Sequence, residues 1–164
     1  MVRKKVLFVC LGNICRSPLA EAIFKHKVKE QGIDQLFEVD SCGTSNYHIG
    51  DPPDGRTLRN ALKNGVPIHH SGRQLTNDDV KRYDIILAMD SSNYQNILRL
   101  PNASQHLDKI QLMRAYDPVH PGSDVPDPYY GGERGFQDVF EILNRSIDCL
   151  IEDLQRKITG GIVP

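Results

Sequence analysis

An uninterrupted apolar run, Val-Leu-Phe-Val-Cys at residues 6–10, constrains the fold of this chain more than any other feature. A strand with one face in water alternates apolar and polar residues, whereas a strand covered on both faces is apolar throughout. Strands of the second kind belong to parallel sheets, whose strands are joined by crossover helices. The run therefore predicts an α/β protein in which helices cover both faces of the sheet.

Further segments along the chain continue this alternation of strands and helices. Residues 37–42, 84–89 and 109–113 fit strands of the same sheet, and residues 57–64 and 92–100 suit helices. We therefore predict a single domain spanning residues 1–164, with a doubly wound, mostly parallel four-stranded sheet and helices on both faces. In such a sheet, ligands bind at the carboxyl ends of the strands.

The first and last helices have the clearest sequence signals. Ser17 can cap a helix and Pro18 fits a first turn, so a helix is expected to begin there and to end near Gly32. The proline-rich residues 115–134 predict a long loop, and such loops in compact domains are often functional. A final helix keeps one face apolar through Phe136, Val139, Phe140, Leu143, Ile147, Leu150, Ile151, Leu154 and Ile158.

Composition and charge exclude several classes of protein. A net charge of −1 does not fit a duplex nucleic-acid binder or an electrostatic membrane anchor, and no apolar run is long enough to span a bilayer. The first ten residues lack the apolar core and cleavage site of a signal peptide. Four scattered cysteines are too few for a disulfide scaffold and favour a reducing, cytoplasmic setting. No nucleic-acid or membrane partner is expected.

The loop after residues 6–10 has the composition of an anion site. Its sequence, C-L-G-N-I-C-R-S-P at residues 10–18, lies between a strand end and a helix start, where backbone N–H groups and the helix dipole favour negative charge. The same field would stabilise a thiolate, which predicts that Cys10 is a nucleophile. Arg16 can hold two oxygens of an oxyanion, and Gly12 and Asn13 tolerate left-handed backbone conformations. The loop lacks the Lys-Ser/Thr of a nucleotide-binding P-loop, and no cysteine or histidine group has zinc-site spacing.

The string at residues 10–18 closely resembles the signature of the low-molecular-weight protein tyrosine phosphatases. Asp-Pro-Tyr-Tyr at residues 127–130 resembles the general-acid motif of that family, and Ala-Met-Asp at residues 88–90, the chain length and the long final helix also fit. The resemblance covers essentially the whole chain. It implies a hydrolase of aryl phosphate monoesters that needs neither a metal nor an organic cofactor.

The resemblance also implies roles for individual residues. Cys10 would attack phosphorus to give a phosphocysteine, Arg16 would stabilise the phosphate oxygens, and Asp127 would act as general acid and then general base. Ser41 and His70 would brace the loop through Asn13, with His69 as a competitor for the place of His70. The predicted substrate-binding residues are Leu11, Gly12, Asn13, Ile14, Cys15, Ser17, Tyr47, Tyr129 and Tyr130. Of these, Ser17 would hydrogen-bond the Cys10 sulfur, while Leu11 and the three tyrosines would form the wall of the aromatic slot.

Two assignments have equally good alternatives. Asp90 could orient Arg16 or the acid loop, or it could cap the helix that follows it. Cys15 could form a reversible disulfide with Cys10, as this pair can in the family, or it could be a small packing residue. Cys42 and Cys149 are interpreted as packed, inert thiols.

Three functions follow from the resemblance. The first is phosphotyrosine phosphatase, acting on a phosphotyrosine-containing protein or a small aryl phosphate, with a tyrosine kinase as a regulatory counterpart. The second is an arsenate reductase of the same fold, which the lack of cysteines between Cys42 and Cys149 disfavours. The third is a non-catalytic phosphate-binding module. Tyr129 and Tyr130 could be phosphorylated, and the protein is expected to be a monomer or to self-associate weakly through them.

Overall fold

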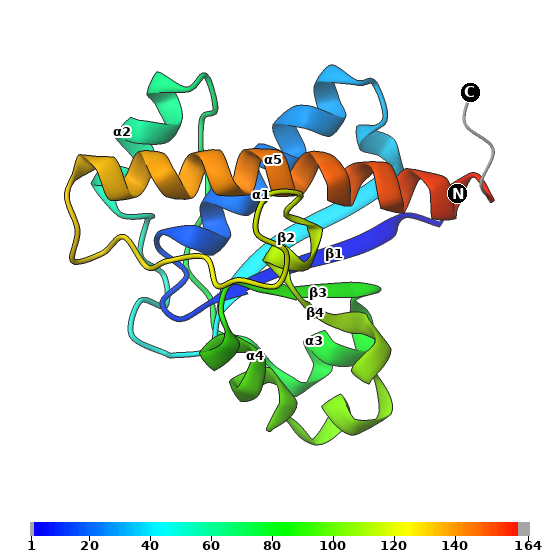
Figure 1. Ribbon diagram of the computed structural model, residues 1–164. Helices are drawn as coiled ribbons and strands as arrows, with labels where there is room; N and C mark the ends of the chain where they lie inside the picture. The colour runs from blue at the N-terminus through cyan, green and yellow to red at the C-terminus, as the bar shows by residue number, and fades with distance from the viewer. Residues whose placement is uncertain (1, 161–164) are drawn as a thin grey trace.

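A four-stranded parallel sheet forms the centre of the molecule, as described by a computed structural model over residues 2–160. The strand order is β2-β1-β3-β4, and all three pairs of neighbouring strands are parallel (Figure 1). Thus the α/β prediction with four strands is confirmed. The strands are β1 (Lys4–Cys10), β2 (Phe37–Gly43), β3 (Ile85–Ala88) and β4 (Ile110–Leu112).

Helices cover both faces of this sheet. Figure 1 shows α1, α2 and α5 on one side and α3 and α4 on the other. Val6 and Phe8 of β1 belong to the core on the α1 and α5 side, whereas Leu7 and Val9 belong to the core on the α3 and α4 side. All four are fully buried, which explains why the strand has no polar residue after Lys5. The helices are α1 (Arg16–Glu30), α2 (Gly55–Lys63), α3 (Asn77–Arg82), α4 (Ser91–Leu98) and α5 (Glu133–Ile158).

The start of α1 differs from the prediction. Ser17 is not the N-cap, because the helix begins at Arg16 and Cys15 takes the capping position. The Ser17 side chain is instead drawn into the centre of the loop, as described below. The helix ends as expected, since Gly32 follows it with a φ of +71° that favours glycine.

Other boundaries move by a few residues, and one helix was missed. The α2 helix begins before Thr57, because the carboxylate of Asp54 caps it by accepting from Arg56 N at 2.8 Å. The α3 helix was not predicted because its six residues, Asn-Asp-Asp-Val-Lys-Arg, are almost all polar. A capping box formed by Thr76 and Asp79 starts it.

The long final helix lies across the sheet as expected. Its predicted apolar stripe is buried from Phe136 to Leu154, whereas Ile158, its last residue, is 38% exposed. Among residues 2–160, no helix has the length and apolar character needed to cross a bilayer. Short 3-10 segments complete the chain at Asp34–Leu36, Pro101–Gln105, Leu107–Lys109 and Met113–Tyr116.

Candidate active site

The loop from Cys10 to Arg16 joins the end of β1 to the start of α1. Its carbonyl groups are bonded outward: Thr44 N donates to Cys10 O at 2.9 Å, and Asp54 N donates to Ile14 O at 2.8 Å. In the part of the chain that the structure describes, no hydrogen bond uses the backbone N–H groups of Leu11, Gly12, Ile14 and Cys15. These donors are therefore available to an anion at the helix N-terminus.

The sulfur of Cys10 lies at the centre of this loop. Cys10 is 2% exposed, and its Sγ lies 2.9 Å from Ser17 Oγ and 3.3 Å from the Asn13 backbone nitrogen, which donates to it. Ser17 Oγ accepts from Asn13 Nδ2 at 2.8 Å, so its own hydrogen is free to reach Cys10 Sγ or the carbonyl oxygen of Cys42. Asn13 N donates to the sulfur, and the Ser17 hydroxyl is placed to donate to it as well.

Asn13 holds the shape of the loop. It is the one non-glycine residue with positive φ, 58°, among the residues described, and it is almost fully buried. Its Nδ2 also donates to Ser41 Oγ at 3.1 Å, and its Oδ1 accepts from Arg73 N at 3.1 Å. Gly12, which we expected to share the left-handed conformation, does not have a positive φ. Its lack of a side chain instead makes room for His48, since a Cβ there would lie 3.1 Å from His48 Cδ2.

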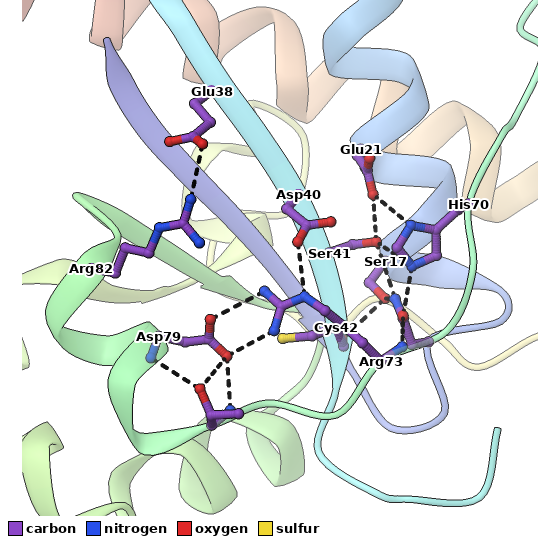
Figure 2. A network of polar contacts seen from close by, with 12 residues as sticks. Ser17, Glu21, Glu38, Asp40, Ser41, Cys42, His70, Arg73, Asp79 and Arg82 are labelled. Carbon is purple, nitrogen blue, oxygen red and sulfur yellow. Dashed lines mark hydrogen bonds and ion pairs between the residues drawn. The ribbon is translucent and has the colours of Figure 1, made fainter. Parts of the chain in front are cut away.

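A second layer of polar residues supports Asn13. Figure 2 shows three of them, Glu21, Ser41 and His70, close together. His70 Nε2 lies 2.7 Å from Asn13 Oδ1, an acceptor, so this nitrogen carries a proton. The other ring nitrogen, Nδ1, lies 3.2 Å from Glu21 Oε1, and Ser41 Oγ donates to the same oxygen at 2.6 Å. Burial alone would raise the pKa of Glu21, but hydrogen bonds from His70, Lys25 and Ser41 outweigh it and lower that pKa.

Ser41 and His70, the two residues expected to brace the loop, both contact Asn13, whereas His69 is exposed. Glu21 was missed in the sequence. Its spacing from Lys25 suggests only a surface ion pair, yet Glu21 is buried beneath the loop.

Glu21, Asp40 and His70 also lie close enough together to be considered as metal ligands. Both carboxylates already contact cations, however. Glu21 pairs with Lys25, and Asp40 accepts from Arg73 Nε at 2.8 Å. The Arg73 fork continues to Asp79 at 2.9 and 3.1 Å, as Figure 2 shows. We therefore interpret the cluster as part of the support of the loop.

Arg16, at the end of the loop, is buried against Asp90 and Val125. Its Nη1 donates to Asp90 Oδ2 at 2.7 Å and to the Val125 carbonyl oxygen at 2.9 Å. Burial alone would lower the pKa of Arg16, but the negative charges of Cys10, Asp90 and Asp127 raise it above its ordinary value. Both alternatives for Asp90 hold, because its Oδ1 also caps α4 by accepting from Asn93 N at 2.7 Å.

Asp127 approaches Arg16 from the long loop before α5. Its Oδ2 lies 3.7 Å from Arg16 Nη2, and its Oδ1 accepts from Tyr129 N at 3.1 Å. The side chain is 41% exposed, in contrast to the buried Arg16. A carboxyl group placed in this way faces both the pocket and water, so it can exchange protons with either.

A pocket of about 300 Å³ joins these groups. Tyr129 and Tyr130 stand at its wall, with ring centroids 5.0 Å apart and planes at 81°, and Arg56 lies over the Tyr129 ring. Asn13 and Ser17 were predicted to bind substrate, but both side chains are buried and neither lines the pocket. His48 does line the pocket, but it was not predicted from the sequence. Its position next to Tyr47 was the one sequence feature that could have indicated it. The lining residues are Cys10, Leu11, Gly12, Ile14, Cys15, Arg16, Tyr47, His48, Asp127, Tyr129 and Tyr130.

The other cysteines differ from Cys10 in their surroundings. Cys15 is also in the pocket, but burial raises its pKa to about 12. Burial raises the pKa of Cys42 well above the ordinary value, and that of Cys149, which is only partly buried, is raised for the same reason. All four thiols are free.

Comparisons with known proteins agree with this geometry. Residues 5–159 match the family model described as low molecular weight phosphotyrosine protein phosphatase. A Schizosaccharomyces pombe protein of that name is 48% identical over 138 residues, which cover 83% of this chain and 87% of the relative. The crystal structure of an Entamoeba histolytica protein tyrosine phosphatase, with Hepes in its active site, superposes with a TM-score of 0.89. It is 39% identical, over 94% of this chain and 98% of its own.

A second kind of phosphatase shares the fold. The Drosophila arginine phosphatase DARP superposes with a TM-score of 0.83 at 32% identity, covering 92% of this chain and 97% of its own. The similarity of fold therefore extends to enzymes named for a different phosphorylated amino acid.

Proposed function

Because the chain belongs to the low molecular weight phosphotyrosine protein phosphatase family, we propose that it hydrolyses phosphotyrosine and other aryl phosphate monoesters through a phosphocysteine on Cys10. One observation carries this proposal above the others. The Cys10 sulfur and the buried Arg16 guanidinium meet in a pocket that also holds a carboxyl group and aromatic walls. This arrangement supports both phosphoryl transfer and recognition of an aromatic leaving group.

In the first step, the Cys10 thiolate attacks phosphorus, the S–P bond forms and the bond to the phenolic oxygen breaks. The free N–H groups of the loop and the Arg16 fork bind the three other phosphate oxygens. Asp90 and the Val125 carbonyl hold Nη1 of Arg16, so its guanidinium is already oriented before substrate arrives. Protein donors thus supply the positive charge that phosphoryl transfer needs.

Asp127 supplies the proton in this step and removes one in the next. It protonates the departing phenolic oxygen, and then, as a carboxylate, it takes a proton from the water that attacks the phosphocysteine. Phosphate leaves as the P–S bond breaks. Ser17 Oγ, 2.9 Å from the sulfur, stabilises the thiolate that is released.

The walls of the pocket favour an aryl group over phosphoarginine, the alternative raised by the similarity to DARP. A phosphoarginine guanidinium carries N–H donors that need acceptors. Above the phosphate site, however, the side chains are mainly apolar or aromatic: Leu11, Ile14, Tyr47, Tyr129 and Tyr130. A phenyl ring has no N–H donors, so it can lie between these side chains without leaving a donor unpaired.

Wild-type protein is expected to hydrolyse phosphotyrosine much faster than phosphoarginine. Replacing Asp127 with alanine should lower kcat/KM for phenyl phosphate by about 10²–10³-fold but that for 4-nitrophenyl phosphate far less, because a good leaving group needs no proton. Phosphate release and steady-state rates would measure both. Equal losses on the two esters would show that Asp127 does not act as the acid, and a wild-type protein inactive on phosphotyrosine would overturn the proposed function.

Cys15 supports a redox function for the same pocket. We propose that peroxide oxidises Cys10 to the sulfenic acid and that the Cys15 thiol displaces water from it, forming a disulfide. Because burial holds Cys15 protonated, Cys10 is the thiol that reacts first. After peroxide treatment, the protein should lose two hydrogens in mass and regain activity with dithiothreitol. Cys15→Ser should be inactivated irreversibly, and a variant that recovers as well as wild type would exclude the disulfide.

The setting of this activity is part of the proposal. We infer a cytoplasmic enzyme, on the basis of the four free cysteines. Its substrates would be phosphotyrosine-containing proteins or small aryl phosphates, with a tyrosine kinase as the counterpart. The exposed rings of Tyr47 and Tyr130 at the pocket mouth support weak self-association over this face.

A further inference from the structure

Asp117, at the start of the long loop before α5, lies buried between two arginines. Its side chain has no exposed surface. Arg114 Nε donates to its Oδ2 at 2.9 Å, and Arg145, from the middle of α5, donates to Oδ1 at 2.8 Å and to Oδ2 at 3.1 Å. None of these three residues lines the pocket. We call them the anchor.

The anchor reaches the acid loop through Arg114. The Nη1 of Arg114, a buried residue, donates to the Asp124 carbonyl oxygen at 2.7 Å, and the Arg114 carbonyl accepts from Gly122 N at 2.8 Å. The carboxylate of Asp124 in turn accepts from Ser91 N at 2.9 Å, at the start of α4. The loop is therefore fixed at Asp124 from two sides, by Arg114 and by α4.

The next residue, Val125, continues this attachment into the active site. Its N–H donates to Met89 O at 2.8 Å, and its carbonyl oxygen accepts from Arg16 Nη1 at 2.9 Å. Val125 is 1% exposed, and Asp127 follows two positions later. A line of hydrogen bonds thus runs from α5 through Arg145, Asp117 and Arg114 to the backbone that carries Asp127. Figure 1 shows the segment after β4 passing beside the middle of α5 before it turns toward the strand ends.

We propose that Arg114, Asp117 and Arg145 are positioning residues for the general acid: they hold the acid loop so that the Asp127 carboxyl stands over the leaving oxygen. This inference rests on the proposed function. The physical need is clear, because the loop has no helix or strand between Tyr116 and Glu133 to hold it. Each unanchored residue would gain backbone freedom, and an acid displaced by about 1 Å transfers a proton much less well.

Arg145→Gln tests the proposal, because this side chain is 31% exposed and its loss leaves Asp117 paired with Arg114. We expect kcat/KM for phenyl phosphate to fall about tenfold, whereas that for 4-nitrophenyl phosphate changes less than about twofold. Arg145→Lys keeps the charge but not the two-pronged contact, so it should recover only part of the loss. The affinity for vanadate, which needs no acid, should be unchanged.

Arg156→Gln is the matched control. It removes another arginine of α5, 56% exposed, whose nearest carboxylate oxygen, on Asp153, lies 3.9 Å away. This variant should behave as wild type on both esters. A merely structural role for Arg145 predicts equal losses on the two esters or none on either, and both results would overturn the proposal.

Amide hydrogen exchange provides a readout that does not depend on activity. In Arg145→Gln, the Val125 amide should exchange faster than in wild type, while the amide of Val9 in β1 should keep its rate. Unchanged exchange at Val125 would reject the anchor even if the kinetics changed. If wild-type protein hydrolysed neither ester, the proposed function would fail, whereas faster exchange at Val125 would still support the anchor as a determinant of loop position.

Discussion

Replacing Cys10 with serine is expected to lower phosphotyrosine hydrolysis by more than about 10⁴-fold, the largest effect among single substitutions in this protein. A serine hydroxyl ionises far less readily than a thiol, so the hydrogen bonds from Ser17 and Asn13 cannot make it an anion near neutral pH. Any phosphoserine that formed would also be a poor leaving group. Steady-state release of phosphate measures the loss.

The same substitution should leave oxyanion binding largely intact. The free N–H groups of the loop and the Arg16 guanidinium do not depend on the sulfur, and the serine side chain is slightly smaller than that of cysteine, so it fits the same space. Vanadate or phosphate affinity, measured by calorimetry, should therefore stay within about tenfold of wild type. Cys149→Ser is the control, because Cys149 is a half-buried cysteine on α5, and this variant should retain full activity. A Cys10→Ser enzyme with activity near that of wild type would refute the nucleophile assignment.

The core of the fold could be predicted because its signals are local. The apolar run at residues 6–10 and the apolar stripe of α5 show burial by spacing alone, and the structure buries both. The α3 helix is different. Its polar sequence has no apolar stripe, and only its capping box, formed by Thr76 and Asp79, indicates where it starts. The start of α1 also differs from the prediction, because the Ser17 hydroxyl contacts Cys10 and does not cap the helix.

The loop at residues 10–16 could likewise be predicted as an anion site because it is continuous in sequence. What could not be predicted is how distant residues hold it. Arg16 donates to a carbonyl 109 positions away, and Asn13 accepts from the backbone nitrogen of Arg73, 60 positions away. Glu21 and the anchor residues belong to no recognisable motif. In the sequence, an acidic residue that is buried against basic residues looks the same as one in a surface ion pair. Only the folded chain distinguishes the two.

Replacing Arg16 with lysine is expected to lower kcat/KM by about 10³-fold, although the positive charge remains. The guanidinium binds Asp90 and the Val125 carbonyl through Nη1 while it presents other N–H groups to the pocket, and a single ammonium cannot reach both sides. Arg16 also holds the acid loop through the Val125 carbonyl, so the lysine variant should position Asp127 less well. In that variant, the rate of hydrolysis should therefore depend less on Asp127. The effects of Arg16→Lys and Asp127→Ala would then be less than additive.

A double-variant cycle on phenyl phosphate measures this coupling. Arg82→Lys is the control, because Arg82 is a half-exposed arginine paired with Glu38 far along the sheet from the pocket, and its replacement should leave the kinetics unchanged. An Arg16→Lys protein that kept a tenth or more of wild-type kcat/KM would show that charge alone is sufficient in this pocket. Full additivity with Asp127→Ala would show that the guanidinium stabilises the phosphate oxygens without also fixing the acid. The size of the coupling therefore separates the two functions of one side chain.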